Sequence, residues 1–373
     1  MGEERADHRP PATDHAPRPW REAVRRFRHW LRQAPPGATV VILAGRHLDG
    51  LAAGVVLRRA CDRAGRATQL LIPPRGEVAW DGALLARLAS GAPAVLVALG
   101  VGGPPAPPPA GLPVLVIDHR PLAEAPGVTV ISGAGWQPPS STSSLVYWLA
   151  QSIADIRKLD WVAALGAMAA LGERTELGLV EAVRRTHGIH WLRELLPLLR
   201  AAGRAAEPPI DAMVRLLSQA RDPHDALTVE RPELMRLLAA RDEVEAAIEA
   251  AKAVAPVALT PLTLVRLNSP CQIEAVLARI WAARQPAAPV LVGNLGDFPE
   301  RVGFAALAAD APAWRAAFLA ALPAGALLEP ATGDAAETVS GAVAAGEWPG
   351  LLARLGLPAG VWTAVRPRRA GSR

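Results

Sequence analysis

The chain has 373 residues, of which 51% are apolar and 20% are charged. This length predicts two or three domains, and the apolar content excludes wholesale disorder. The net charge is only +5, and every basic residue except Lys158 and Lys252 is an arginine, a bias that fits a phosphate-bearing partner but also fits coding composition.

Two cysteines, Cys61 and Cys271, lie far apart in apolar stretches with a helical pattern, and we expect both to be buried free thiols. No apolar run approaches the ~20 residues that a transmembrane helix needs. The first residues also contain no signal-peptide core. The sequence therefore predicts a cytoplasmic protein without a membrane segment.

The first predicted element is a helix that starts at Pro19, after a charged and proline-rich stretch, 1–18, that we expect to be a disordered tail. Apolar residues recur at helical spacing along one side of this helix, and arginines occupy the other side. The basic side is either a solvated face or a nucleic-acid contact. Its members are Arg21, Arg25, Arg28 and Arg32.

Short apolar strands then alternate with helices as far as residue 131. The first strand, 39–44, is rich in β-branched residues, as is typical of a parallel strand covered on both faces. The alternation predicts an α/β fold with a doubly wound parallel sheet. Further strands are expected at 67–72, 94–99, 113–117 and 128–131, and a helix capped by Asp81 is expected after the second strand.

Charged residues directly follow two of these strands, in the turn 45–50 and in the segment 118–120. Ligands of open α/β sheets bind at the carboxyl ends of the strands, so both clusters should line one rim and form a site. The alternative is structural. Asp49 would then cap the helix that begins near Leu51, and His47 would be a surface turn residue.

A serine-rich run, 140–144, precedes a helix and offers either N-capping oxygens or an anion-binding site at the helix start. Residues 156–230 are almost wholly helical in pattern. Within them His187 and His190 stand one turn apart, but no acidic or thiol partner follows at metal-ligand spacing, so no metal is expected there.

The remaining sequence begins with a single long helical pattern, 231–254, that suits a connector between domains. A second α/β pattern follows, and its last segment, Val339–Glu347, is small and flexible enough to approach a ligand closely. A loose basic tail is expected at 367–373. The elements expected between connector and tail are strands at 262–267, 289–293 and 303–306 and helices at 272–284 and 314–322.

The order and spacing of these features resemble the DHH phosphoesterase family, which includes RecJ-type single-strand exonucleases and small-nucleotide phosphodiesterases. The resemblance covers residues 38–365. It implies a DHH-like phosphoesterase domain at 19–230 with a helical second half, the connector helix at 231–254, and a smaller DHH-associated substrate-binding domain at 255–366.

Family enzymes hold two divalent ions, commonly manganese, between motifs of Asp and His, and the ions activate a water and stabilise the phosphate charge. The first motif of the family is His-x-Asp-x-Asp-Gly. This chain has Gly45 and His47 at the first two of these positions, and it keeps Asp49 and Gly50. The motif is therefore only half retained.

The other motifs are altered as well. Ala98 stands where the second motif has its Asp, and Ala170 aligns with the Asp of the fourth. The third motif, Asp-His-His, corresponds to residues 118–120, where Asp118 and His119 are kept and Arg120 replaces the last histidine. Of the C-terminal motif Gly-Gly-His-x-x-Ala-Ala-Gly the chain keeps only 344–346, and Gly341 occupies the His position.

Bridging carboxylates make a pair of dications tolerable, so the loss of two acidic residues predicts that the two-ion site is absent. Arg46 and Arg120 make the rim more positive and can bind phosphate without a metal. The retained motif residues still form a set suited to one manganese or zinc ion. They are His47, Asp49, Asp118 and His119.

The resemblance and these losses together predict a catalytically impaired RecJ-like protein. It would bind a nucleotide or single-stranded nucleic acid in the cleft between its two α/β lobes. Catalytically silent relatives serve as partners in replication or repair assemblies, so a protein partner is also conceivable. The alternatives are an active metal-dependent phosphodiesterase or exonuclease that acts on short nucleotides, and a scaffold or interaction module without a ligand.

Overall fold

The computed structural model describes residues 18–362 except for 36, 78, 91–93, 138, 174–177, 261, 287, 309–311, 329–337 and 359–361. The tails predicted at 1–18 and 367–373 lie outside this part, apart from Arg18, which begins a helix. The chain divides into two compact units, one of residues 1–200 and 210–235, the other of 201–209 and 236–373. The domain limits drawn from the sequence stay predictions.

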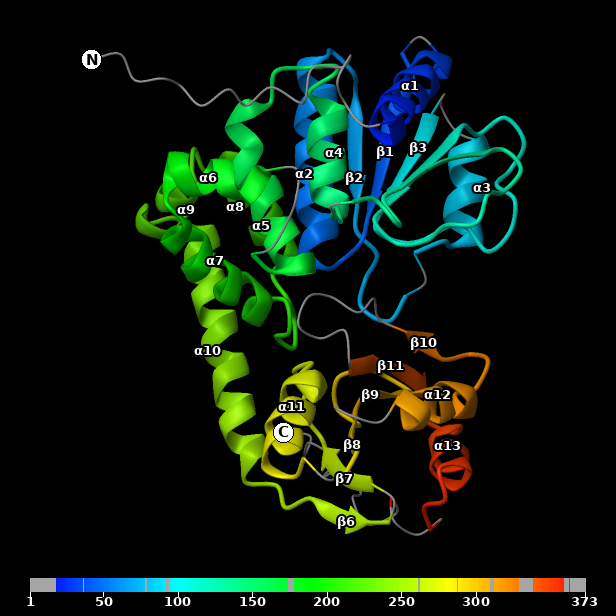
Figure 1. Ribbon diagram of the computed structural model, residues 1–373, viewed down its shortest axis with the longest axis vertical. Coiled ribbons are helices and arrows are strands. Elements are labelled where there is room, and N and C mark those ends of the chain that lie inside the picture. The colour runs from blue at the N-terminus through cyan, green and yellow to red at the C-terminus, as the bar shows by residue number, and fades with distance from the viewer. Residues whose placement is uncertain are drawn as a thin grey trace, which may run out of the picture. The chain divides into compact units, whose positions relative to one another are not determined.

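The first unit is built on a five-stranded sheet in the order β2-β1-β3-β4-β5 (Figure 1). Every neighbouring pair of strands is parallel, which confirms the predicted doubly wound sheet. The central strands are almost entirely buried because their apolar runs are covered on both faces. The strands are β1 (Thr39–Ala44), β2 (Thr68–Leu71), β3 (Ala94–Leu99), β4 (Val114–Asp118) and β5 (Val128–Ser132).

Side chains cap four helices in the described part of this unit, α2, α3, α4 and α9. Asp81 accepts N–H bonds from Ala83 and Leu84 and so caps α3, as predicted. Beyond residue 156 the described part of the unit is helical, also as predicted. The helices are α1 (Arg18–Gln33), α2 (Leu48–Arg63), α3 (Gly82–Ser90), α4 (Thr142–Ala150), the 3-10 helix η1 (Arg157–Leu159), α5 (Asp160–Leu171), α6 (Leu179–His187), α7 (Ile189–Ala202), α8 (Ile210–Gln219) and α9 (Pro223–Thr228).

Helices cover both faces of the five-stranded sheet. Val41 and Leu43 of β1 join an apolar cluster with Leu85 of α3. Ala44 points to the other face, where α2 packs so closely that a Cβ on Gly54 would lie 3.0 Å from that of Ala44. Alternate residues of the strands therefore contribute to two apolar cores, one on each face of the sheet. Helices α2 and α4 both begin at the carboxyl edge of the sheet.

The predicted connector is one helix, α10 (Pro232–Lys252), because neither proline nor glycine interrupts its pattern after Pro232. In the described part of the chain, no helix is both long and apolar enough to span a membrane.

The second unit contains a six-stranded mixed sheet in the order β10-β11-β9-β8-β7-β6. Only the pair β7 and β8 is parallel, and the other neighbours are antiparallel. The strands are β6 (Val257–Leu259), β7 (Leu262–Leu267), β8 (Val290–Asn294), β9 (Arg301–Leu307), β10 (Leu327–Leu328) and β11 (Thr338–Ala344).

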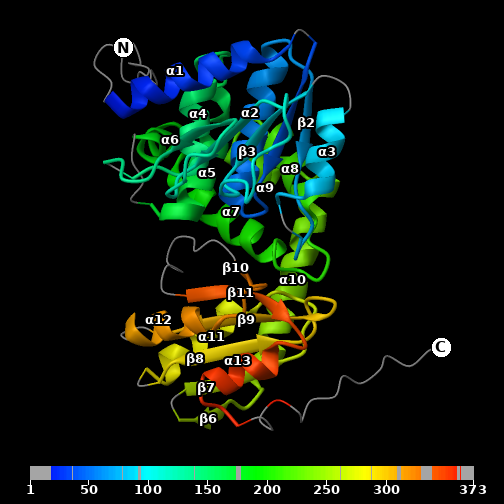
Figure 2. The same cartoon turned by 90° about the vertical axis from the view of Figure 1, so that its right-hand side faces the viewer.

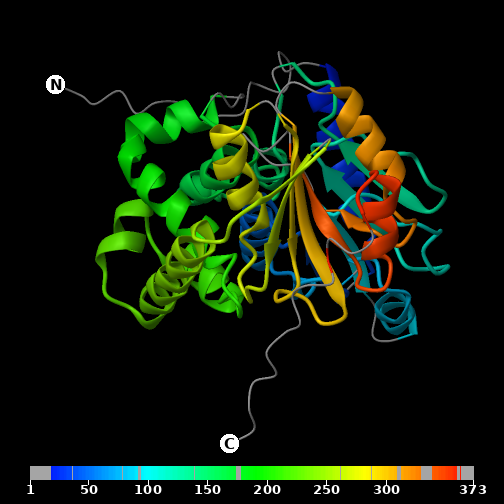
Figure 3. The ribbon, with the colours of Figure 1, turned by 90° about the horizontal axis from the view of Figure 1, so that it is seen from below.

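Helix α11 lies on one face of this sheet, and α12 and α13 lie on the other (Figure 3). On the latter face Phe304 of β9 packs against Phe318 and Trp348 in an aromatic core. The helices are α11 (Glu274–Arg284), α12 (Pro312–Ala321) and α13 (Trp348–Arg354).

The segment 339–347, expected to be flexible, is mostly strand. Its residues from Val339 to Ala344 belong to β11, which pairs with β9 on one side and β10 on the other. Small residues are poor strand formers by themselves, but here two neighbouring strands fix the backbone. The expectation of flexibility is therefore wrong for this part of the segment.

Candidate functional site

His47 occupies the turn between β1 and α2, and it caps that helix. Its Nδ1 accepts a hydrogen bond from the Gly50 N–H at 3.1 Å, and its Nε2 lies 2.9 Å from the carbonyl oxygen of Gly100. Because a carbonyl only accepts and a backbone N–H only donates, Nε2 carries a proton and Nδ1 supplies a lone pair. Both ring nitrogens are thus used within the protein, and His47 is not merely a surface turn residue.

Asp49 caps a helix other than the one expected. Its carboxylate accepts N–H bonds from Thr142 at 3.0 Å and from Ser143 at 2.8 Å, and the residue is only 1% exposed. Asp49 therefore caps α4 rather than α2, where its charge also complements the helix dipole. The anion at the serine-rich helix start is this carboxylate, and Ser141 supplies the expected capping oxygen to Ser144.

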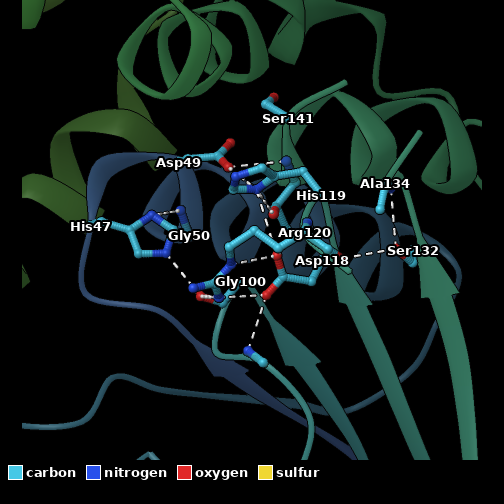
Figure 4. Close-up of polar contacts among 12 residues, drawn as sticks. His47, Asp49, Gly50, Gly100, Asp118, His119, Arg120, Ser132, Ala134 and Ser141 are labelled. Carbon is cyan, nitrogen blue, oxygen red and sulfur yellow. Dashed lines mark hydrogen bonds and ion pairs between the residues drawn. The ribbon is translucent and has the colours of Figure 1, made fainter. Parts of the chain in front are cut away.

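Asp118, the last residue of β4, is fully buried and is held by Arg120 (Figure 4). Its Oδ1 accepts from the backbone N–H and the Nε of Arg120, and its Oδ2 accepts from Nη2 at 2.6 Å and from the Gly102 N–H at 3.0 Å. Burial by itself would raise the pKa of Asp118, but the hydrogen bonds and charge of Arg120 outweigh it and hold the pKa below its usual value. Asp118 is therefore a carboxylate in a charge-assisted pair.

His119 lies between the two acidic residues. Its Nδ1 is 3.1 Å from Thr142 Oγ1 and 3.6 Å from one carboxylate oxygen each of Asp49 and Asp118. Burial, together with the nearby charge of Arg120, outweighs the two carboxylates and holds the pKa of His119 below its usual value. The two charged clusters, which are far apart in sequence, therefore meet at one rim of the sheet around an imidazole that is neutral at neutral pH.

The donor atoms of this rim do not fit a metal ion. Each of the four carboxylate oxygens of Asp49 and Asp118 accepts at least one hydrogen bond from a chain N–H. The lone pair of His47 is directed to Gly50, and the guanidinium of Arg120 already places a cation against Asp118. Among the described residues, no group of three His, Cys, Asp or Glu side chains is arranged to hold a metal.

The altered motif position Gly45 is closely packed. A Cβ at Gly45 would lie 2.6 Å from His47 Nε2 and 3.0 Å from the carbonyl oxygen of Gly100. A histidine at position 45 and the present position of His47 therefore exclude each other. The next residue, Arg46, is partly buried in the same turn.

Ala98 and Ala170 are both buried, the first at the end of β3 among apolar neighbours and the second in the last turn of α5. Gly341 lies in β11, where a Cβ would meet the carbonyl oxygen of Leu327 at 2.1 Å. A side chain at Gly341 therefore requires β10 to move, and the strand as it stands has no room for a histidine.

The sequence did not indicate that main-chain groups of the loop after β3 take part in the site. The carbonyl of Gly100 accepts from both His47 and Arg120, and the Gly102 N–H donates to Asp118. Gly100 has φ +66°, a conformation that favours glycine. Gly100 and Gly102 both have positive φ just after β3, and two glycines close together at a strand end were the signal that could have indicated this loop.

The pair His187 and His190 does not form a shared site. His187 Nε2 lies 3.3 Å from the buried carboxylate of Asp160, an acidic partner that the sequence spacing did not reveal, whereas the ring of His190 packs against Trp191. One carboxylate and one imidazole are too few ligands for a metal site.

No family model and no curated protein matches the chain. Among solved structures, exonuclease RecJ bound to manganese is similar, with a TM-score of 0.61 and 16% identity over 94% of this chain and 96% of that one. The chain has a RecJ-like DHH fold. RecJ from Thermus thermophilus, in complex with Mn2+, gives a TM-score of 0.64 at 17% identity over 93% of this chain, which spans 55% of that larger protein.

The RecJ-like fold extends to other proteins. CDC45 from Entamoeba histolytica gives a TM-score of 0.53 at 7% identity over 90% of this chain and 98% of that one. A solved DHH domain from a member of a family of ribosomal proteins gives 0.57 at 14% identity over 90% of each chain. At these identities the likeness concerns the fold, because one fold carries many functions.

Proposed function

We propose that this protein is a cytoplasmic RecJ-like protein that binds a phosphate-containing ligand, either a nucleotide or single-stranded nucleic acid, at the rim of its parallel sheet without hydrolysing it. The observation that carries the proposal is the guanidinium of Arg120, which binds the Asp118 carboxylate through Nε and Nη2. A side-chain cation thus lies beside Asp118, which corresponds to a metal-binding aspartate of the DHH phosphoesterase family that this chain resembles.

The loss of hydrolysis is supported by the state of the remaining acids. An activated water needs either a metal ion or a carboxylate free to accept its proton. The oxygens of Asp49 are bound to the start of α4, and those of Asp118 are bound to Arg120 and Gly102. These hydrogen bonds and the guanidinium disfavour a metal or a proton on either carboxylate, because both would compete with donors that are already in place.

Phosphate binding is supported by the cations that remain at the rim. The side chain of Arg120 is 33% exposed, and its Nη1 has no hydrogen bond to any described residue. Arg46 follows β1 at the same rim. Guanidinium groups bind phosphate oxygens bidentately in the absence of a metal.

The proposal is tested by the affinity of fluorescent single-stranded DNA and of short nucleotides for the protein with Arg46 and Arg120 replaced by alanine. We expect at least about tenfold weaker binding and a shallower salt dependence. A second variant, Arg46→Ala alone, leaves the Asp118 pair intact and should show part of the loss. Unchanged affinity in both folded variants would instead indicate a scaffold without a phosphate ligand.

A further inference from the structure

The outward face of α1 carries a stripe of arginines. Arg21, Arg25, Arg28 and Arg32 are all exposed and recur about once per turn, so they extend over about 16 Å of the helix. The opposite face is anchored in the core, where Trp20, Phe27 and Trp30 are at most 4% exposed. The stripe is therefore fixed to the first unit.

Two further arginines extend this stripe at the C-terminal end of α2. Arg66 donates to the carbonyl of Leu31 in α1, and Arg63 donates to that of Asp155. Arg28 donates to Ser152 in the same loop. Backbone carbonyls of α1 and of the segment after α4 thus hold three of these guanidinium groups. We treat the six arginines of this end of the unit as one basic surface, Arg21, Arg25, Arg28, Arg32, Arg63 and Arg66.

Most of this basic surface is not neutralised by the protein. Within the described part of the chain, Arg21, Arg28, Arg32, Arg63 and Arg66 form no ion pair. Glu22 pairs with Arg25, and Asp155 is bound bidentately by Arg157. Adjacent like charges without counter-ions repel each other, and a polyanion would relieve that repulsion.

The basic surface is distant from the rim. Helices α2 and α4 both begin at the rim, near Asp49, and α2 ends at Arg63 after 16 residues, about 24 Å along its axis. Arg28 contacts the segment that follows the other end of α4. Figure 2 shows α1 lying lengthwise across this end of the first unit. The basic surface and the rim are thus separate sites.

We propose that this basic surface binds double-stranded nucleic acid through the phosphate backbone, independently of base sequence. The regular repeat of cations matches a partner with a regular repeat of anions. Single strands are normally held by aromatic side chains on which bases stack, but the aromatic side chains of α1 are buried. Helix α1 also has its apolar face buried, so it offers nothing to insert into a membrane.

The test measures binding of a fluorescent 24-base-pair DNA duplex of mixed sequence to the full chain. The variant Arg21→Ala/Arg28→Ala/Arg32→Ala should bind on the order of 10²-fold more weakly at 0.1 M salt, and the slope of log affinity against log salt should fall by about 2 to 3. The control Arg87→Ala/Arg185→Ala/Arg315→Ala removes the same charge from exposed positions on α3, α6 and α12. It should lose far less affinity.

Equal losses in the two triple variants would overturn the proposal, because the effect would then be one of net charge. Displacement of the duplex by polyglutamate as effectively as by unlabelled duplex, at equal charge, would also overturn it in favour of an acidic protein. Replacement of Arg46 and Arg120 should leave duplex affinity within about twofold, since distant sites act independently. A parallel loss there would mean that the two surfaces are not separate sites.

Discussion

Asp49 and Asp118 are each surrounded by N–H donors of the chain itself. The sequence placed both residues at strand ends and so indicated one rim, because the carboxyl ends of parallel strands meet at the same edge. It could not indicate that Asp49 caps α4, since Thr142 lies 93 positions further along the chain. That pairing depends on how α4 packs against α2, which local sequence patterns do not contain.

Replacement of Asp49 should destabilise the first unit. Asp49→Ala leaves the N–H groups of Thr142 and Ser143 buried without an acceptor, which should cost about 2–4 kcal/mol of unfolding free energy. Asp49→Asn keeps one acceptor and should cost about half of that. Urea denaturation measures both. Asp81→Ala, at the exposed cap of α3, is the control and should cost only about 0.5–2 kcal/mol; an equal effect of all three variants would contradict the buried role of Asp49.

The pair of Asp118 and Arg120 predicts a pH dependence. The folded pKa of Asp118 is below its unfolded value, so the unfolded state binds more protons in acid. The stabilisation is therefore present above about pH 4 and is lost as the pH falls through the folded pKa. Relative to the wild type, Arg120→Ala should be less stable by about 2–3 kcal/mol at pH 7, and this deficit should shrink below pH 4.

Urea denaturation at pH 7, 5 and 3.5 measures this difference. The matched control is Arg157→Ala, which breaks the bidentate pair with Asp155, whose side chains are 66% and 65% exposed. Exposed pairs contribute at most about 1 kcal/mol, so this variant should be nearly neutral. A deficit of Arg120→Ala that does not change with pH would contradict the ion pair as its cause.

Strands are the elements that the sequence predicted best where their runs are β-branched and apolar. The limits of β1, β3 and β7 agree with the expected ones to the residue. The strand β11 was missed because Ser340, Gly341 and Ala342 have little intrinsic strand preference. Its conformation comes from pairing with β9 and β10, which is tertiary information.

Because β10 lies so close to β11, the addition of one methyl group at Gly341 should destabilise the second unit. Gly341→Ala places a Cβ against the carbonyl of Leu327, so the strands must shift, and we expect a loss of about 1–3 kcal/mol. Gly346 has open space around it, and Gly346→Ala should stay within about 0.5 kcal/mol of the wild type. Hydrogen exchange over 338–344 is the measurement. Equal protection in the two variants would contradict the tight pairing.

At the scale of the whole molecule, each compact unit contains one of the two cysteines. Cys61 lies in α2 of the first unit, and Cys271 lies in the second. Both are buried free thiols, as expected from their apolar surroundings. Burial raises the pKa of Cys61 to about 12, so its reactive thiolate is scarce at ordinary pH. Each cysteine can therefore report the opening of its own unit.

Neither thiol should react with Ellman's reagent at pH 8 in the native protein, and both should react in urea. The variants Cys61→Ala and Cys271→Ala leave one thiol each, so the urea dependence of labelling gives the opening free energy of each unit separately. The measurement is the rate of absorbance increase. Rapid labelling of Cys61 without urea would show that its thiol, on the buried side of α2, is accessible in the native protein, which contradicts its burial.

The RecJ-like fold and the state of the rim lead to opposite expectations for activity. The solved RecJ structure of similar fold is that of an exonuclease, whereas the rim of this chain has its acids bound to N–H groups and a guanidinium in contact with Asp118. Fold is shared among proteins with different activities, so the side chains of the site decide. The state of these side chains therefore predicts that the protein does not hydrolyse its ligand.

The most direct test follows 5′-labelled single-stranded DNA and a short RNA during incubation with the protein and manganese, together with binding of the same strands. We expect the strands to be bound and to stay intact. Manganese-dependent cleavage that disappears in Asp49→Asn, with that variant still folded, would contradict it.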